Sequence, residues 1–282
     1  MNGILLVNKE KGMTSHDVIN KLRKILNTKK IGHCGTLDPM AEGLLVCLVG
    51  YATKINPYLN SATKVYDATF RLGVATTTQD LEGEVIETKE YQDDLTFDKL
   101  HQTIFSFIGP QKQTPSIYSA IKVNGKKLYE YARNNEEVII PSRDILVEKI
   151  ELRGIKDNDI NIIVQCSSGT YIRTLCFDIA KKLNYPGVLT KLIRLNVDNF
   201  SLEDAYTLEE ISKGNYHLLD ISKGLNNFDV VELDNLLLKD IKNGKPLLIN
   251  QERPFIIRIN NENIALYDKS NDGYAKILRG LW

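Results

Sequence analysis

Hydrophobic residues in the first fifty positions follow two different periods. Residues 4–7 form a short apolar run that predicts a strand. Apolar positions within residues 18–25 then recur at helical spacing, and Thr14 or Ser15 stands where the cap of that helix is expected. Residues 43–49 are almost continuously apolar, which is typical of a strand buried on both faces. The chain therefore begins by mixing strands with a helix.

Five more segments have a clear pattern. The helices are expected at 97–107 and 172–183, and the strands at 65–72, 146–152 and 160–166. In the first of these strands the period of two places Tyr66 on the inward row. Residues 32–39, by contrast, have the composition of a glycine-rich turn.

Two changes of composition suggest how the chain is divided. Residues 111–141 are polar, basic and tyrosine-bearing, and they predict a mobile excursion from a larger domain that spans 1–225. Beyond Asn226, short strands alternate with Asn, Asp and Gly turns and predict a small β-domain over 226–282. Its elements are expected at 234–243 (helix), 255–259, 264–267 and 275–278 (strands).

Composition indicates a globular protein and argues weakly against a nucleic-acid ligand. The 282 residues are 43% hydrophobic and 26% charged, with a formal net charge of +0, whereas phosphate binding usually leaves a basic footprint. The distribution changes that picture, because residues 1–64 contain nine Lys or Arg against four Asp or Glu, and residues 65–110 contain three against nine. A basic face on a neutral protein remains compatible with these counts.

No segment predicts a membrane span, a disulfide or a metal site. Apolar runs fall short of the roughly 18 residues that a membrane helix needs, and the N-terminus lacks the order of a signal peptide, so we expect a cytoplasmic protein. The cysteines have neither disulfide-framework nor zinc spacing, and we expect buried thiols at Cys34, Cys47, Cys166 and Cys176.

The candidate chemistry begins in the glycine-rich turn. Asp38 precedes Pro39 there, and an Asp-Pro step by itself is an ordinary turn former. The whole segment, however, reads GHCGTLDPMAEGLLVCLVG and closely resembles the catalytic-aspartate motif of the bacterial tRNA pseudouridine-55 synthases, the TruB family. Further segments resemble other motifs of that family in its order: NKEKGMTSHDVINKLRK, KVYDATFRLG, PSIYSAIKVNGKKLYEYAR, SSGTYIRTL and KLIRL. Several independent motifs make chance agreement very improbable.

The resemblance implies both a fold and a reaction. The fold is α+β, pseudouridine-synthase-like, with a mixed and mainly antiparallel central sheet flanked by helices and a small C-terminal β-rich PUA-like domain used against RNA. The reaction is isomerisation of uridine 55 in the T-arm (TΨC loop) of tRNA to pseudouridine, with no metal or other cofactor. The partner is tRNA, no protein partner is required, and we expect a monomer.

Three residues take catalytic roles by the resemblance. Asp38 is the essential carboxylate, a competent oxygen nucleophile that leaves again readily. Arg173 is the arginine that pairs with it and opposes its desolvation, although alone it reads as a surface arginine at a helix start. Tyr66 stacks on the target base and assists loss of the proton from carbon 5, although alone it reads as a core tyrosine.

Other positions resemble substrate contacts of the family. Tyr171 and Leu192 would line the uracil pocket, and His33 would help to extrude the target base from its stack. Each of them alone reads as a core or turn residue. Phosphate contacts and base stacking are expected in the basic segments, at Lys9, Lys122, Lys126, Lys127, Arg133, Tyr118 and Tyr129.

The sequence departs from the family at Glu10, Cys34 and Thr77, where proline, threonine and aspartate are usual, and none of these is a proposed catalytic residue. A Cys34 thiol nucleophile activated by His33 is rejected, since neighbours in the chain rarely meet side chain to side chain. Two alternatives stay open: a tRNA-binding folding chaperone that does not need catalysis, and the guide-RNA-dependent relative, which the insertion after Pro115 disfavours.

Overall fold

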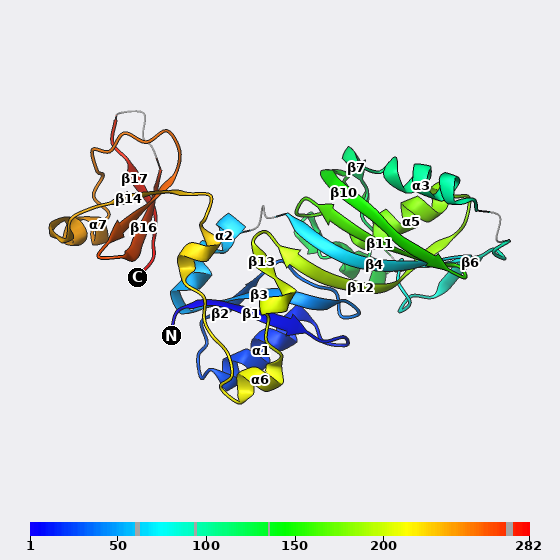
Figure 1. Cartoon of the computed structure of the whole chain (residues 1–282), viewed down its shortest axis with the longest axis horizontal. Helices are drawn as coiled ribbons and strands as arrows, with labels where there is room; N and C mark the ends of the chain where they lie inside the picture. The colour runs from blue at the N-terminus through cyan, green and yellow to red at the C-terminus, as the bar shows by residue number, and fades with distance from the viewer. Residues whose placement is uncertain (60–62, 93–94, 135, 269–272) are drawn as a thin grey trace.

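The computed structural model describes residues 1–59, 63–92, 95–134, 136–268 and 273–282. Within them a nine-stranded sheet crosses the larger part of the molecule (Figure 1). Its strands follow the order β1 (Gly3–Lys9), β3 (Glu42–Val49), β12 (Gly187–Val197), β4 (Lys64–Leu72), β11 (Asp159–Cys166), β10 (Arg143–Lys156) and β7 (Gly109–Gln113), with β2 (Ile31–Cys34) beside β3 and β13 (Phe200–Ser201) beside β12. Among the described strands of this sheet, the one parallel pairing joins β3 to β12, which confirms the mixed, mainly antiparallel sheet.

One half of the sheet is covered by α1 (Ser15–Ile25) and α6 (Leu208–Ser212). Thr14 caps α1, because its hydroxyl accepts from the Asp17 N–H at 3.0 Å while the Asp17 carboxylate accepts from the Thr14 N–H at 2.9 Å. The opposite face packs against short helical turns: η1 (Gly50–Ile55), α2 (Asn56–Leu59), η2 (Leu202–Asp204) and η3 (Ile221–Gly224). Burial on both faces explains why β3 is apolar throughout.

The other half of the sheet is covered by α3 (Phe97–Phe105) and α5 (Ile172–Lys182). Strand β4 alternates between buried and half-buried positions along its whole length, as its period of two predicts, and Tyr66 lies on the buried row. A hairpin of β5 (Val74–Thr76) and β6 (Val85–Thr88) follows β4. Among the described helices, none is long and apolar enough to cross a membrane.

The two halves meet where β3 runs parallel to β12. The pairing covers only Glu42 with Ile193 and Gly43 with Arg194. Gly43 has φ +98°, and a Cβ there would lie 2.5 Å from the backbone oxygen of Arg194. Glycine is therefore required for the strands to approach. The loop that carries Asp38 ends at this junction.

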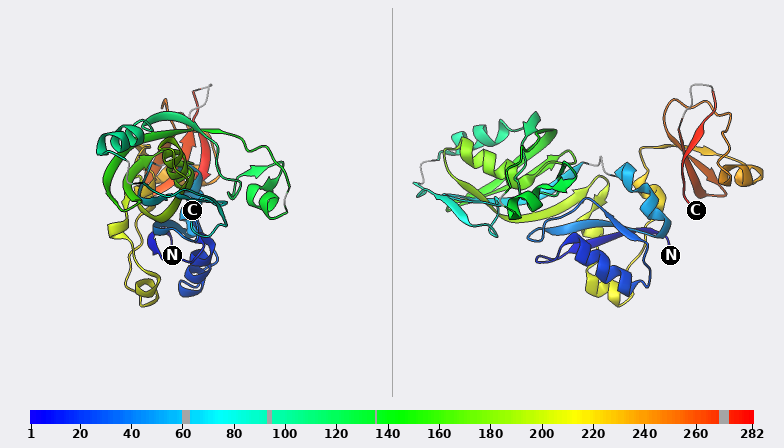
Figure 2. Two further views of the ribbon diagram at one scale, coloured as in Figure 1. Left: turned by 90° about the vertical axis from the view of Figure 1, so that its right-hand side faces the viewer. Right: turned by 180° about the vertical axis from the view of Figure 1, so that it is seen from behind.

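The predicted excursion projects from the edge of the sheet (Figure 2, left). It contains β8 (Lys122–Val123), β9 (Lys126–Lys127) and α4 (Leu128–Arg133). The hydroxyls of Thr114 and Ser142 lie 2.8 Å apart at its base. Residues 111–113, which the sequence assigned to the excursion, instead pair with β10 as part of β7.

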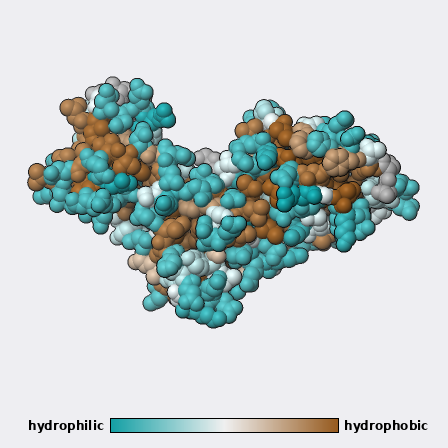
Figure 3. Space-filling view, viewed as in Figure 1, coloured by the Kyte–Doolittle hydropathy of each residue, from teal (hydrophilic) through white to brown (hydrophobic). Residues whose placement is uncertain are grey.

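The C-terminal segment forms its own sheet of β14 (Asp229–Glu232), β15 (Phe255–Ile259), β16 (Glu262–Asp268) and β17 (Lys276–Gly280), with η4 (Asn235–Leu237) and α7 (Leu238–Lys242). It has a separate hydrophobic cluster. It lies at the far end of the molecule from α3 and α5, and the space-filling view shows a saddle between these two ends (Figures 1 and 3). Ile256, Leu266 and Leu281 pack into the core beneath β1 and β3, which fixes this small sheet to the larger domain.

Nine of the described strands were not predicted. They are β2, β5, β6, β7, β8, β9, β12, β13 and β14. Residues 32–34 were assigned to a turn because of their glycine and polar residues, yet they pair with β3. Strand β12 was missed because Thr, Lys, Arg and Asn interrupt its apolar residues. Strand β12 lies between β3 and β4, and hydrogen bonds from both neighbours override its weak local signal.

Candidate active site

Asp38 lies on the loop between β2 and β3, and this loop is fixed mainly by side chains from distant elements. The Ser15 hydroxyl, at the start of α1, accepts from the Leu37 N–H at 2.8 Å and lies 3.1 Å from the Leu37 carbonyl oxygen. The Ala41 N–H donates to the Asp38 carbonyl at 3.1 Å. Both peptide groups of Leu37 are thus satisfied, and the backbone beside Asp38 has one defined position.

Arg194 supports the same loop from β12. Its guanidinium is fully buried and donates to the carbonyls of Gly35 at 3.0 Å, Thr36 at 3.4 Å and Leu44 at 2.7 Å. A planar cation with several donors suits such a set of carbonyls. Arg194 belongs to the KLIRL motif, from which only Leu192 was predicted to line the site.

Lys9 was expected to contact phosphate, but it occupies a different place. Its side chain is fully buried, and its ammonium donates to the carbonyls of Met13 at 2.7 Å, Glu10 at 3.0 Å and Pro39 at 3.4 Å. A phosphate contact on the protein surface requires an exposed ammonium. Lys9 instead holds the far end of the Asp38 loop.

Burial of Lys9 predicts a distinct pH dependence of stability. Burial lowers its pKa from 10.5 to about 8, against the opposing charges of Glu42 and Asp38. Between these two values the unfolded chain keeps a proton that the folded protein has released, so raising the pH through this window stabilises the fold. We expect wild type to gain about 3 kcal/mol relative to Lys9→Met between pH 8 and 10.5. Urea unfolding of both proteins across this range measures it, and a constant difference would contradict it.

Asp38 and Arg173 form an ion pair. Nε of Arg173 lies 2.9 Å from Oδ2 of Asp38. The N–H direction does not meet the geometry of a hydrogen bond, so the contact is an ion pair only. The arginine side chain is 7% exposed, whereas Asp38 is 39% exposed and faces the cavity. The carboxylate is therefore paired and still open to a ligand.

Arg173 is fixed by further partners that were not predicted from the sequence. Its Nη1 lies 3.3 Å from Oδ2 of the buried Asp80 and donates to the Thr78 carbonyl at 2.7 Å. Its Nη2 donates to the Tyr118 carbonyl at 3.1 Å. The guanidinium thus joins the Asp38 loop, the β5–β6 turn and the insertion. Asp80 was not predicted as a site residue, and near it only Thr77 was singled out, as a departure from the family motif.

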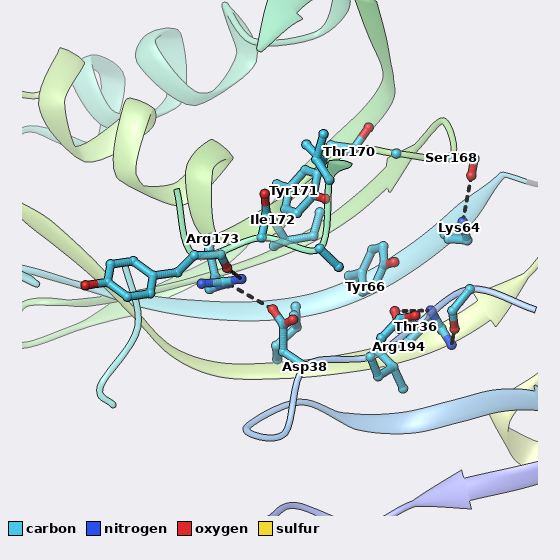
Figure 4. Close-up of a pocket in the computed structure, with 18 of the residues that line it drawn as sticks. Thr36, Asp38, Lys64, Tyr66, Ser168, Thr170, Tyr171, Ile172, Arg173 and Arg194 are labelled. Atoms are coloured by element: carbon cyan, nitrogen blue, oxygen red, sulfur yellow. Dashed lines mark hydrogen bonds and ion pairs between the residues drawn. The ribbon is translucent and has the colours of Figure 1, made fainter. Parts of the chain in front are cut away.

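A cavity of about 420 Å³ opens beside this pair (Figure 4). Tyr66, Tyr171 and Leu192 line it together with Asp38 and Arg173, so the structure brings these five predicted residues together. Its volume and its mixture of aromatic, aliphatic and charged walls suit a small planar group that carries hydrogen-bonding edges. The cavity lies where the two halves of the sheet meet.

Tyr66 and Tyr171 are both protonated phenols at neutral pH. Burial raises the pKa of Tyr66, opposed by the charge of Arg194, and burial likewise raises the pKa of Tyr171, opposed by Arg143. A phenol that stays protonated has no basic form available at neutral pH, which favours packing and hydrogen-bond donation over proton abstraction. The backbone of Tyr171 is held on both sides by the amide of Gln113, at 2.8 and 3.0 Å.

The insertion closes one side of the cavity. Tyr118 and Tyr129 line it. Lys122 and Arg133 are exposed, as phosphate contacts must be, and the Arg133 guanidinium lies 5.5 Å from the centre of the Tyr129 ring. Lys126 is paired with Glu136 at 2.6 Å, so its charge is partly neutralised.

His33 is outside this cavity. It lies on β2, pairs with Cys47 and is half-buried, and burial lowers the pKa of its imidazole. All four cysteines are buried thiols, and burial raises the pKa of Cys34, opposed by Lys64 and Arg194. A protonated, buried thiol is not a nucleophile, which agrees with the rejection of that role. Among the described residues, no three His, Cys, Asp or Glu side chains gather as metal ligands.

Comparison with known proteins decides the family. Residues 23–172, more than half of the chain, match the family described as TruB family pseudouridylate synthase (N terminal domain). The chain is 44% identical to tRNA pseudouridine synthase B of Oceanobacillus iheyensis, over 99% of this chain and 97% of that protein. It is 41% identical to the protein of the same name from Bacillus subtilis, over 96% and 90%. The chain belongs to the TruB family.

The TruB protein described here is accordingly a pseudouridine synthase, which is an isomerase. A solved structure described as a Cbf5-Nop10-Gar1 complex resembles it with a TM-score of 0.76 at 22% identity, over 99% of this chain and 85% of the matched chain. An H/ACA RNP bound to a substrate RNA resembles it with a TM-score of 0.73 at 21% identity, over 99% and 85%. At these identities the likeness supports the fold, and it agrees with the predicted α+β architecture.

Proposed function

We propose that this TruB protein isomerises uridine 55 in the T-arm of tRNA to pseudouridine, with Asp38 as the catalytic nucleophile. The relatives named tRNA pseudouridine synthase B, which match nearly the whole chain, support the tRNA substrate. The observation that carries the catalytic assignment is the Asp38–Arg173 pair, at 2.9 Å, in a cavity that Tyr66, Tyr171 and Leu192 line.

The proposed reaction only rearranges bonds within the uridine. The bond from N1 of uracil to C1′ of ribose breaks, the base turns, and a bond from C5 to C1′ forms while C5 loses its proton to solvent and N1 gains one. No atom or electron is added overall. Asp38 attacks either C1′ or the uracil ring and is released when the new bond forms, and a carboxylate is suited to both steps.

Each neighbour of Asp38 has a proposed role. Arg173 holds the carboxylate in place beside the cavity through a charge-assisted contact. Tyr66 stacks against the uracil as a neutral phenol, which its raised pKa favours. Tyr171 and Leu192 hold the other faces of the base, and a cavity lined in this way suits one pyrimidine but not a stacked loop.

The target base must leave its stack to enter the cavity. We propose that His33 acts on the RNA outside the cavity, where its position on β2 leaves it, rather than on the flipped base. Lys122 and Arg133 contact phosphates from the insertion, and residues 226–282 form a PUA-like RNA-binding domain beside a catalytic domain of residues 1–225. We propose a monomer without a required protein partner.

The direct test incubates purified protein with unmodified tRNA transcript in the presence of a chelator. We expect one pseudouridine per tRNA at position 55, detected by chemical derivatisation and primer extension, and none in a transcript with cytidine at that position. Tight binding to tRNA without product would contradict the proposal and support the alternative of a tRNA-folding chaperone. Pseudouridine at another position would support the activity but refute uridine 55 as its target.

A further inference from the structure

The cavity has a second polar end that the isomerisation does not use. Lys64 and Ser168 line it, and the Lys64 ammonium donates to the Ser168 hydroxyl at 3.0 Å. Figure 4 shows them beyond Tyr66, on the opposite side from Asp38. Lys64 is 7% exposed and comes from β4, two residues before Tyr66 on the same buried row.

Positive charge is in excess at this end. Arg173 is neutralised by Asp38 and Asp80, whereas neither Lys64 nor Arg194 has a carboxylate within ion-pair distance among the residues that the structure describes. Burial lowers the pKa of Lys64 and the nearby Arg194 lowers it further, against the thiols of Cys34 and Cys166. A buried cation bonded only to a neutral hydroxyl is costly unless an anion joins it.

Gly35 and Gly169 line the cavity near this end. Gly35 has φ +77°, and a Cβ there would lie 3.4 Å from atoms of both Lys64 and Arg194. Gly169 has φ +86°, and a Cβ there would lie 3.2 Å from Nη1 of Arg143. Glycine at both positions therefore lets these cationic side chains pack closely against the backbone beside the cavity.

We propose that Lys64 and Ser168 form a phosphate subsite that binds the RNA phosphodiester next to the flipped uridine. The proposal rests on the proposed function, because its occupant is the nucleotide whose base lies over Tyr66. Phosphate oxygens accept from both an ammonium and a hydroxyl, and the ligand supplies the charge that this end lacks. The contact fixes the sugar between the phosphate and Asp38, so the subsite is a positioning device for C1′.

The test is a double-mutant cycle between protein and RNA. A neutral methylphosphonate replaces, in turn, each of the two phosphates that flank the target uridine in a T-arm stem-loop. For one of them we expect wild type to lose about tenfold in affinity, the scale of a charge-assisted contact. Lys64→Met should bind normal RNA about tenfold more weakly than wild type does. Introducing the methylphosphonate should then weaken its binding by less than a further factor of two. Ser168→Ala should show the same coupling to a smaller extent.

Controls separate this contact from a structural role. Lys191→Met removes an exposed lysine of β12 that does not line the cavity, and it should show full sensitivity to the methylphosphonate. Lys64→Arg should regain affinity for normal RNA. The proposal would be overturned if the losses of affinity from the protein variant and from the methylphosphonate were additive at both phosphates, for both the Lys64 and the Ser168 variants. Inhibition of RNA binding by inorganic phosphate, without coupling between variant and methylphosphonate, would overturn it as well. If wild type binds the RNA but forms no pseudouridine, the proposed function is refuted. The phosphate subsite is still tested in that case, because the coupling is measured by binding.

Discussion

Asp38→Asn is expected to abolish isomerisation while leaving RNA binding intact. The amide has the shape of the carboxylate but cannot act as a nucleophile, so we expect the single-turnover rate to fall roughly 10⁴-fold or more. Release of tritium from C5-labelled uridine in tRNA measures it, because the new carbon–carbon bond requires loss of that hydrogen. Filter binding of the same RNA should change less than threefold, since Asp38 is a half-exposed residue among many contacts.

A matched control for this variant is Asp159→Asn. Asp159 is also paired with an arginine, Arg71, at 2.8 Å and is similarly exposed, at 32%, but it lies on β11 outside the cavity. Its replacement should leave the rate within twofold of wild type. Activity of Asp38→Asn within tenfold of wild type would remove Asp38 from the chemistry and leave the cavity as a binding site.

Local sequence patterns predicted β4 and α5, two of the elements that carry the site, but neither β12 nor the contacts between these elements. The period of two in β4 placed Tyr66 on the buried row, and the helical spacing of α5 placed Arg173 in its first turn. Both signals depend only on neighbours in the chain. The motif resemblance added Asp38, which by spacing alone is an ordinary turn residue.

The residues that were missed or misplaced depend on long-range packing. Asp80 reaches Arg173 because the β5–β6 hairpin folds back across the sheet, and no local period records that. Lys9 was expected to contact phosphate, yet its ammonium donates to three carbonyls of a folded loop. Arg194 interrupts an apolar strand, and its burial among carbonyls is visible only once β12 is paired with β3 and β4.

Arg173→Lys is expected to damage catalysis and stability together, although it keeps the charge. One ammonium cannot reach Asp38, Asp80 and the carbonyls of Thr78 and Tyr118 at once. The connection that the guanidinium makes between the Asp38 loop, the β5–β6 turn and the insertion is therefore lost. We expect kcat to fall by about 10² to 10³, as when a preorganised donor is removed from an active site. The free energy of unfolding should fall by about 2 kcal/mol, because a buried carboxylate loses part of its pairing.

The comparison of two positions decides whether Arg173 acts on Asp38 or only on the fold. Asp80→Asn also breaks the buried pair but leaves the contact with Asp38 in place, so it should lose similar stability and far less kcat. Arg71→Lys, at a bidentate but exposed pair, should cost less than about 1 kcal/mol and no activity. Equal losses of kcat in Arg173→Lys and Asp80→Asn would mean that the arginine serves the architecture of the cavity. Loss confined to Arg173→Lys would identify it as the group that positions the nucleophile.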